Sequence, residues 1–355
     1  MYNLNSEICE FLSNIEPDKI YKEQASKAQN ELREYLRTSE KFKDLFLDSF
    51  LTGSYKRHTA IKEIKDVDII VILNKAATLL EPNEDIKKIF NTLKETLKES
   101  YDIEQVEQQQ RSVKLIWKFE NKKDYNIRNE ALTIDIVPAI RTQEGSNYNL
   151  WIPDRNLDTW IKTNPQGHID KITEKNQNSS DINGHKPFVP FVKILKFWKS
   201  ETYKVPKRPK GFLLECIAYH SWDNTSDNWF ECIIEAYQDI INKYGAYKNI
   251  NTDTEISSII EDIGLEGEYI HTSTTYNNFK KFIEKVETAL NTLNEAKQAD
   301  CKYEAIKKFQ EVFGSDYFPS PTESDKDIKD KIVEVQKNVS IITGSNKNPE
   351  AKAYG

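Results

Sequence analysis

The sequence predicts an α/β plus α chain, in which a mixed α/β lobe is followed by a mostly helical lobe. In the first half, helical segments alternate with short runs of β-branched residues that are typical of strands. From about Pro187 onward, apolar residues recur at the spacing of helices. A chain of 355 residues can form two lobes with large cores. We therefore expect an α/β domain with an N-terminal helix at 1–165, a helical domain at 166–320, and a C-terminal helix with a flexible tail at 321–355.

The expected order in the first lobe is helix, strand, helix, strand, strand. Residues 16–40 and 81–100 have amphipathic helical patterns with few breakers. A short helix is expected at 55–62. Runs that are rich in β-branched residues or that alternate in polarity predict three strands, at 66–73, 112–119 and 131–140.

The second lobe is expected to contain several helices in succession. Five segments have helical periodicity: 186–204, 211–222, 229–245, 275–298 and 302–314. Between the lobes, residues 163–186 are polar and rich in Gly and Asn, so we predict a hinge segment there. After Pro321 we expect one charged helix and a loose end.

Composition and charge exclude several classes of protein. The mean hydropathy is -0.70 and no run of about 18 apolar residues occurs, so we expect no membrane span. The first residues show no basic region followed by an apolar one, so no secretory signal is expected. The formal net charge of -7 argues against binding to long nucleic acid, although nucleotides need only a local basic pocket. The four cysteines form no zinc-binding pattern, and we expect reduced thiols in a cytoplasmic protein.

Two carboxylates, Asp66 and Asp68, interrupt an apolar strand near its start. Side chains two residues apart on a strand point to the same face, and two anions this close repel unless a cation lies between them. A hard divalent ion such as Mg²⁺, or Mn²⁺ in its place, would relieve that repulsion. The strand at 131–140 offers a third lone carboxylate, Asp135. Three carboxylates on adjacent strands can hold two metal ions for phosphoryl transfer.

The alternative is that each aspartate caps a turn or pairs with a lysine. Gly53 and Ser54, upstream of the carboxylates, favour the metal interpretation. A glycine lets the backbone approach a phosphate, which a serine hydroxyl and a helix N-terminus can then bind. The combination predicts a site for a metal and a phosphate.

The segments "GSYKRHTAI…DVDIIV" and "IDIVPAI" resemble the nucleotidyltransferase superfamily that shares the DNA polymerase β-type catalytic core. Within it, the chain resembles the bacterial CD-NTases, the cyclic-oligonucleotide synthases of the anti-phage systems called CBASS. The resemblance covers most of residues 15–320, and His58 stands where the family often has glycine. It implies a nucleotidyltransferase core, an oligoadenylate synthetase-like bilobal architecture, and two Mg²⁺ ions on Asp66, Asp68 and Asp135 in the cleft between the lobes.

Basic residues gather at 193–210, where seven basic residues accompany one acid. On composition alone this segment is a solvated lysine face. However, "FVKILKFW" resembles a family helix whose basic residues hold the donor triphosphate, and the resemblance implies that role for Lys193 and Lys196.

Two further residues are candidates for the nucleotide site. The segment "GFLLECIAYH" resembles a family helix whose aromatic residue stacks on the donor base, which implies that role for Phe212. Packing in the core is an equal alternative for that side chain. Arg111 precedes a predicted strand and is expected either in the cleft or on the surface. The five histidines are expected to be structural or exposed.

The resemblance implies a cytoplasmic bacterial enzyme that joins NTPs into a cyclic di- or trinucleotide, a second messenger for a downstream effector. It implies no need for long nucleic acid. One alternative is a nucleotidyltransferase that modifies RNA or protein in a toxin–antitoxin system, although the acidic net charge argues against an RNA substrate. Another is a catalytically idle nucleotide-binding regulator, which would have little reason to keep three clustered carboxylates.

The last residues, "NPEAKAYG", are polar and finish on a small residue, Gly355. The plain expectation is a frayed terminus. Some CD-NTase operons encode ubiquitin-like conjugation enzymes that join the synthase's C-terminal residue to a target. The resemblance therefore implies that Gly355 is a candidate conjugation site.

Overall fold

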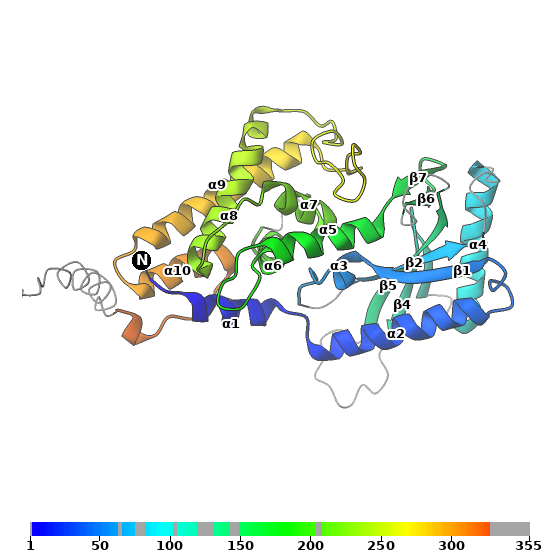
Figure 1. Cartoon of the computed structure of the whole chain (residues 1–355), viewed down its shortest axis with the longest axis horizontal. Coiled ribbons are helices and arrows are strands. Elements are labelled where there is room, and N and C mark those ends of the chain that lie inside the picture. Colours follow the sequence, from blue (N-terminus) through cyan, green and yellow to red (C-terminus); the bar gives the residue numbers. More distant parts are fainter. Residues whose placement is uncertain are drawn as a thin grey trace, which may run out of the picture.

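The computed structural model describes residues 2–62, 66–74, 82–101, 105–118, 131–142, 149–203 and 208–326. A mixed sheet with two flanking helices lies at one end of an elongated molecule, and a group of helices lies at the other (Figure 1). This arrangement confirms the predicted α/β plus α class. The predicted domain boundaries at 165 and 320 stay predictions. In the described part of the chain, no helix combines the length and the apolar character that a membrane crossing requires.

The sheet half contains three helices and seven strands among the described residues. These are α2 (Lys19–Thr38), β1 (Phe46–Thr52), α3 (Gly53–Lys56), β2 (Asp66–Leu73), α4 (Pro82–Ser100), β3 (Val106–Gln108), β4 (Val113–Lys118), β5 (Ala131–Arg141), β6 (Leu150–Asp154) and β7 (Thr159–Thr163). The strand order is β1-β2-β5-β4-β3, with β6 paired to β5 and β7 paired to β6. The predicted strands correspond to β2, β4 and β5, and the long predicted helices to α2 and α4. The helix expected at 55–62 is instead α3, which begins and ends earlier.

One face of the sheet packs against helices, and the other carries the three predicted carboxylates. Val67 and Ile69 of β2 belong to a hydrophobic cluster that also contains residues of α2 and α4. Because side chains alternate along a strand, Asp66, Asp68 and Asp135 lie on the opposite face of the sheet. One face therefore anchors the sheet to its helices and leaves the other for the carboxylates.

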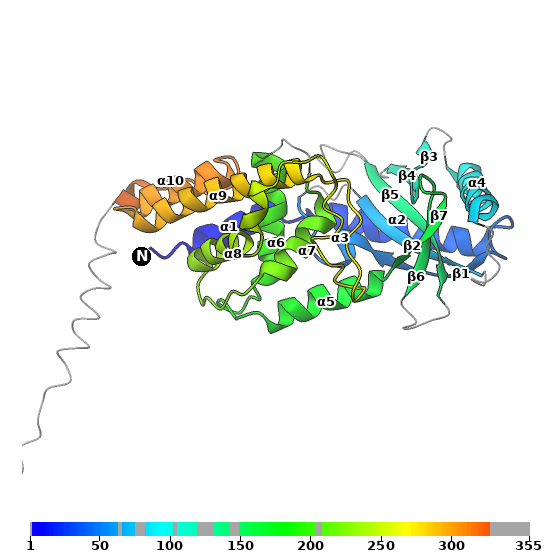
Figure 2. The same cartoon turned by 90° about the horizontal axis from the view of Figure 1, so that it is seen from above.

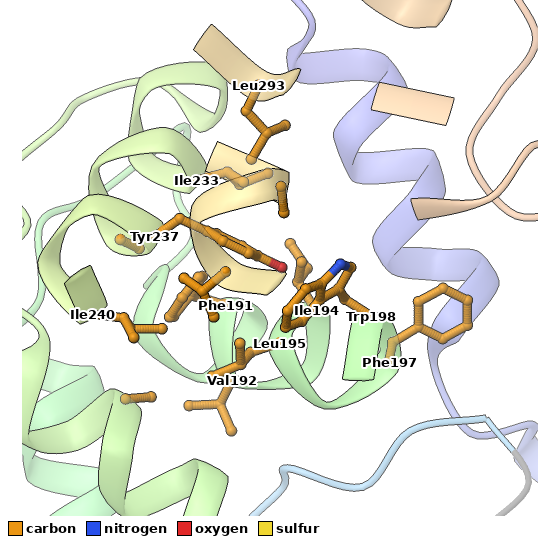
Figure 3. Packing of buried hydrophobic residues seen from close by; sticks show 14 of the residues in the cluster. Phe191, Val192, Ile194, Leu195, Phe197, Trp198, Ile233, Tyr237, Ile240 and Leu293 are labelled. Atoms are coloured by element: carbon orange, nitrogen blue, oxygen red, sulfur yellow. The ribbon is translucent and has the colours of Figure 1, made fainter. Parts of the chain in front are cut away.

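The helical half is formed around α6. Its helices are α1 (Asn5–Ile15), α5 (Pro165–Asn178), α6 (Phe188–Phe197), α7 (Gly211–Ser221), α8 (Trp229–Tyr244), α9 (Tyr276–Gln298) and α10 (Lys302–Phe313), and a π-helical turn, Trp198–Thr202, continues α6. Figure 3 shows Phe191 and Trp198 against Tyr237 of α8, with ring centroids 5.9 and 5.6 Å from that of Tyr237. The five predicted helical segments are confirmed.

The predicted hinge at 163–186 is wrong for most of its length, because α5 occupies residues 165–178. The Asn164 side chain caps this helix by accepting a hydrogen bond of 2.8 Å from the Gly167 backbone N–H, and proline stands at its first position. Ile169 and Ile172 then give the helix a buried face. Figure 2 shows α5 extending from beside the sheet along the helical half. The polar composition of the segment reflects an exposed helix face.

The first helix, α1, packs with the helical half although it precedes the sheet. Leu4, Ile8, Phe11 and Ile15 all belong to the hydrophobic cluster of that half. The ring centroid of Phe11 lies 5.2 to 5.5 Å from those of three other phenylalanines, Phe197, Phe313 and Phe318. Figure 1 accordingly shows the N-terminus beside α10.

We expect Phe11→Ala to lower the free energy of unfolding by about 3–5 kcal/mol, because it removes a fully buried ring that joins α1 to the helical core. Urea denaturation followed by circular dichroism measures the change. Glu10→Ala, on the exposed side of the same helix, should shift that free energy by no more than about 0.5 kcal/mol. Similar small shifts for both variants would show that α1 contributes little to this core.

Candidate active site

A cavity of about 590 Å³ lies between the sheet half and the helical half. The sheet half lines it with Gly53, Arg57, Asp68 and Arg111, among others, and the helical half with residues of α5, α7 and the loop at 262–271. This volume is in the usual range for sites that bind small molecules. The two halves therefore enclose a space that could accept a nucleotide.

The three predicted carboxylates lie together on adjacent strands. β2 and β5 run parallel, and their register places Asp68 directly beside Asp135. Asp66 lies two residues earlier on the same face. Burial and the charge of Asp135 raise the pKa of Asp68 to about 6. Burial also raises the pKa of Asp135, although a hydrogen bond of 3.0 Å from Ser112 opposes that rise. The cluster thus carries the charge repulsion that a cation would relieve.

The residue types at this cluster fit a hard divalent ion, because carboxylate oxygens are the ligands that Mg²⁺ and Mn²⁺ take. Their placement on neighbouring strands fits as well. Among the described residues, no group of three or more Asp, Glu, His or Cys side chains is arranged so that it could hold a metal ion. Metal binding by Asp66, Asp68 and Asp135 therefore stays a prediction that rests on their chemistry and position.

Gly53 makes room for the Asp68 carboxylate. The pairing of β1 with β2 sets Thr52 opposite Asp68, and Gly53 follows with φ at +72°. A Cβ atom at Gly53 would lie 1.8 Å from Asp68 Oδ2, so no other residue fits without moving that carboxylate. Ser54 follows in α3, and its contact with a phosphate stays a prediction. His58, where the family often has glycine, has a positive φ of 59°, a conformation that glycine adopts most readily.

A buried ionic cluster, which sequence reasoning missed, joins the two halves beside the cavity. The carboxylate of Glu215, on α7, is fully buried. It accepts hydrogen bonds from Arg57 Nε at 2.7 Å, Arg57 Nη2 at 3.3 Å, Thr59 Oγ1 at 2.9 Å and Lys196 Nζ at 3.2 Å. Burial alone would raise the pKa of Glu215, but the charges of Arg57 and Lys196 outweigh it and lower the pKa to about 2. Glu215 is therefore ionised, and two cations share it.

The two predicted triphosphate lysines are engaged in ion pairs. Lys193 pairs with Glu16, and Lys196 donates to the Thr59 carbonyl oxygen at 2.9 Å as well as to Glu215. Burial lowers the pKa of Lys196, while the charge of Glu215 opposes that change. Neither lysine is among the residues that line the cavity. Their direct contact with a triphosphate stays a prediction.

Phe212 lies in the cavity wall and also packs against the helical core, and its stacking on a donor base stays a prediction. The guanidinium carbon of Arg57 lies 4.9 Å from its ring centroid, and the ring of His168 lies 4.5 Å away. His168 Nε2 is 2.6 Å from Asp262 Oδ1, which ties α5 to the cavity-lining loop at 262–271. The lone histidine carried no sequence signal for this position.

Arg111 also lies in the cavity wall, about one third exposed. Its Nε donates to Asp154 Oδ2 at 2.8 Å, and Asp154 is fully buried. The charged helix predicted after Pro321 lies largely outside the described residues. Gly355, the candidate conjugation site, lies entirely outside them.

Comparison with known proteins finds relatives of this chain among nucleotide second-messenger synthases. Residues 2–176 match the family described as the Second Messenger Oligonucleotide or Dinucleotide Synthetase domain. The cyclic AMP-AMP-AMP synthase of Acinetobacter sp. is 31% identical over 299 residues, which cover 81% of this chain and 78% of that protein. The cyclic AMP-AMP-GMP synthase of Enterobacter hormaechei is 23% identical over 372 residues, with 91% and 94% covered.

Solved structures share the fold. The structure of CdnC from E. coli MS115-1 with ATP has a TM-score of 0.67 at 19% identity and covers 89% of this chain and 99% of that one. CdnG from Bradyrhizobium diazoefficiens in complex with GTP has a TM-score of 0.61 at 13% identity, with 89% and 96% covered.

We expect Gly53→Ala to reduce the formation of nucleotide product by about 100-fold or more, because the new methyl group displaces Asp68. Gly184→Ala is the matched control, since Gly184 also has a positive φ, +82°, but nothing lies within 4 Å of the position that its new methyl group would take. Both variants place an alanine at a position with positive φ, but only Gly53→Ala brings a methyl group into collision with Asp68. Equal activity in the two variants would contradict this role for Gly53.

Without a divalent ion, ionised Asp68 should destabilise the protein. Its folded-state pKa of about 6 lies above its ordinary value of 3.8, so stability is lost as the pH rises from about 4 through 6. Asp68→Asn should lack that loss and be more stable than wild type above pH 6, by about 1–3 kcal/mol, and similar to it near pH 4. Urea midpoints measured with a chelator between pH 4 and 7.5 give the comparison. Parallel curves for the two proteins would show that Asp68 bears no such strain.

Proposed function

Because the chain belongs to the CD-NTase family of cyclic-oligonucleotide synthases, we propose that it uses ATP as its main substrate and makes an adenine-containing cyclic trinucleotide. The observation that carries this proposal is the row of carboxylates on adjacent strands, beside a cavity of nucleotide size, in a chain 31% identical to a cyclic AMP-AMP-AMP synthase. A second relative makes a cyclic AMP-AMP-GMP product, so both favour three nucleotides with adenine among them.

In this proposal, Asp66, Asp68 and Asp135 would hold two Mg²⁺ ions, or Mn²⁺ in their place. Such ions, when bound, neutralise phosphate charge and make the attacking hydroxyl more acidic. Gly53 keeps the Asp68 carboxylate in position, and the Ser54 hydroxyl donates to a phosphate oxygen. These residues orient the triphosphate at the sheet side of the cavity.

The reaction is a nucleotidyl transfer that repeats until the ring closes. The acceptor 3′- or 2′-hydroxyl oxygen forms a bond to the donor α-phosphorus, and the bond from that phosphorus to the bridging β-phosphate oxygen breaks. The hydroxyl proton passes to solvent and pyrophosphate leaves. The cavity walls from both halves hold donor and acceptor in line, which removes the entropic cost of bringing them together. The donor base lies against Phe212 on the helical side.

We extend the proposal to the setting of the enzyme. The soluble product would act on a downstream effector in anti-phage defence, and the enzyme would work in the bacterial cytoplasm, where NTPs are available. Conjugation of Gly355 by ubiquitin-like enzymes stays a prediction, because that residue lies outside the described part of the chain.

Incubation with the four ribonucleoside triphosphates and Mg²⁺, followed by mass spectrometry, tests the proposed function. We expect a cyclic trinucleotide that contains AMP and that forms from free nucleotides alone. An enzyme that modifies RNA or protein would form product only after such an acceptor is added. A nucleotide-binding regulator would form none under either condition, and either result would overturn the proposal.

Asp68→Asn and Asp135→Asn should each abolish this product while the protein stays folded, because each removes a ligand and relieves repulsion in the apoprotein. Asp48→Asn is the matched control, since Asp48 is an exposed carboxylate on the same sheet and is not among the cavity-lining residues. It should retain wild-type turnover. Near-wild-type turnover by either of the first two variants would end the carboxylate mechanism.

A further inference from the structure

Asp154, at the end of β6, is a fully buried carboxylate that the nucleotidyl transfer itself does not use. Its Oδ1 accepts hydrogen bonds from the backbone N–H groups of Asn156 and Leu157 at 3.0 and 3.1 Å. Its Oδ2 accepts one from Arg111 Nε at 2.8 Å, and Gln110 Nε2 donates to both oxygens at 3.0 and 2.9 Å. Burial alone would raise the pKa of Asp154, but these hydrogen bonds outweigh it and lower the pKa. Asp154 is therefore ionised, and it holds its neighbours firmly.

The side chains that Asp154 holds belong to the turn at 109–112, which joins β3 to β4. Two contacts with backbone oxygens strengthen this attachment. The Arg155 backbone N–H donates to the Gln110 carbonyl oxygen at 3.0 Å, and Arg155 Nη1 donates to the Gln109 carbonyl oxygen at 3.0 Å. A further backbone hydrogen bond of 2.8 Å closes the turn itself. The end of β6 therefore determines where this turn lies.

The last residue of the turn, Ser112, contacts one of the predicted metal ligands. Its neighbour Val113 belongs to the hydrophobic cluster under α2 and α4, so Ser112 points to the face of the sheet that carries the carboxylates. Ser112 is 7% exposed, and its Oγ lies 3.0 Å from Asp135 Oδ1 and 3.2 Å from Gln109 Oε1. A serine hydroxyl has one proton, and a carboxylate accepts it more strongly than an amide oxygen does. Ser112 therefore donates to Asp135.

The hydrogen bond from Ser112 limits how the Asp135 carboxylate can turn. The terminal torsion of an aspartate side chain has broad energy minima, so an unattached carboxylate rotates readily. Here Oδ1 is held, and in the described part of the chain no hydrogen bond engages Oδ2. Groups that hydrogen-bond to a metal ligand orient it, and their loss usually costs about 10- to 100-fold in metal affinity. One oxygen of Asp135 is thus fixed and the other is left for a cation.

We propose that Ser112 and Asp154 are positioning residues for Asp135. Ser112 holds one oxygen of Asp135 so that the other is presented to a divalent ion, and Asp154 holds the turn that carries Ser112. Both act through other residues, and neither is among the residues that line the cavity. The inference rests on the proposed function for the presence of a metal ion at Asp135.

Binding of Mn²⁺ to the full-length protein without nucleotide tests the role of Ser112, and the electron paramagnetic resonance signal of the free ion measures it. We expect Ser112→Ala to weaken Mn²⁺ binding about 10-fold or more. Asp135→Asn, which removes the ligand itself, should abolish the same binding. Ser179→Ala is the matched control, since Ser179 is also 7% exposed and donates a hydrogen bond of 2.6 Å, to the Asn176 carbonyl oxygen in the helical half. It should leave the Mn²⁺ affinity within about twofold of wild type.

Asp154→Asn tests the second step, from Asp154 to Ser112. The variant loses the charge and turns an amide N–H₂ toward groups that donate, so the turn is held less firmly. We expect Mn²⁺ affinity to fall about threefold or more in the otherwise wild-type protein, and to change little further in Ser112→Ala, because Asp154 acts through Ser112. Additive losses would overturn this role of Asp154. If Asp154→Asn does not fold, Gln110→Ala replaces it, since Gln110 is an exposed partner of Asp154 in the same turn.

A purely structural Ser112 gives a different result. In that case Ser112→Ala binds Mn²⁺ as wild type does, or loses no more affinity than Ser179→Ala, and either outcome overturns the inference. Product formation by the wild type is measured separately. A wild type that binds Mn²⁺ through Asp135 but makes no cyclic product would defeat the proposed function and leave the positioning roles in place. A wild type whose Mn²⁺ binding does not depend on Asp135 would overturn both.

Discussion

The carboxylate of Glu215 accepts hydrogen bonds from residues that belong to both halves of the molecule. Arg57 and Thr59 follow the short helix α3 at the end of β1, whereas Lys196 comes from α6 at the centre of the helical core. Loss of one partner from such a buried cluster costs about 3–5 kcal/mol, because a charge is left without compensation. The cluster therefore acts less as a source of net stability than as a constraint on how α3 meets α7. That constraint determines where the walls of the cavity lie.

The sheet forms the wall of the cavity that contains Gly53 and Asp68. Parallel pairing of β2 with β5 places Asp68 beside Asp135, and antiparallel pairing of β1 with β2 places Gly53 over Asp68. Both pairings hold because alternate residues of β2 and β5 are buried under α2 and α4, so a shift of one residue would expose that apolar face. The burial of one sheet face thus fixes the register of the charged residues on the other.

The sequence predicted the features that local patterns encode. Asp66, Asp68 and Asp135 were identifiable because a lone carboxylate in an apolar strand breaks a pattern of period two. The pairing of Arg57 with Glu215 spans 158 residues, and no local pattern encodes it. One signal was present, since Glu215 is the only acid in the apolar run at 211–222, and a buried acid needs a partner. Polar composition predicted a hinge at 163–186, but the Asn164 cap and the proline after it begin a helix there.

The two walls are coupled through α3. Gly53, at its first residue, touches Asp68, and Arg57, which directly follows its last residue, is bound to Glu215. A helix of four residues has little freedom to adjust one end without the other. The position of α3 is therefore set by Asp68 at one end and by Glu215 at the other.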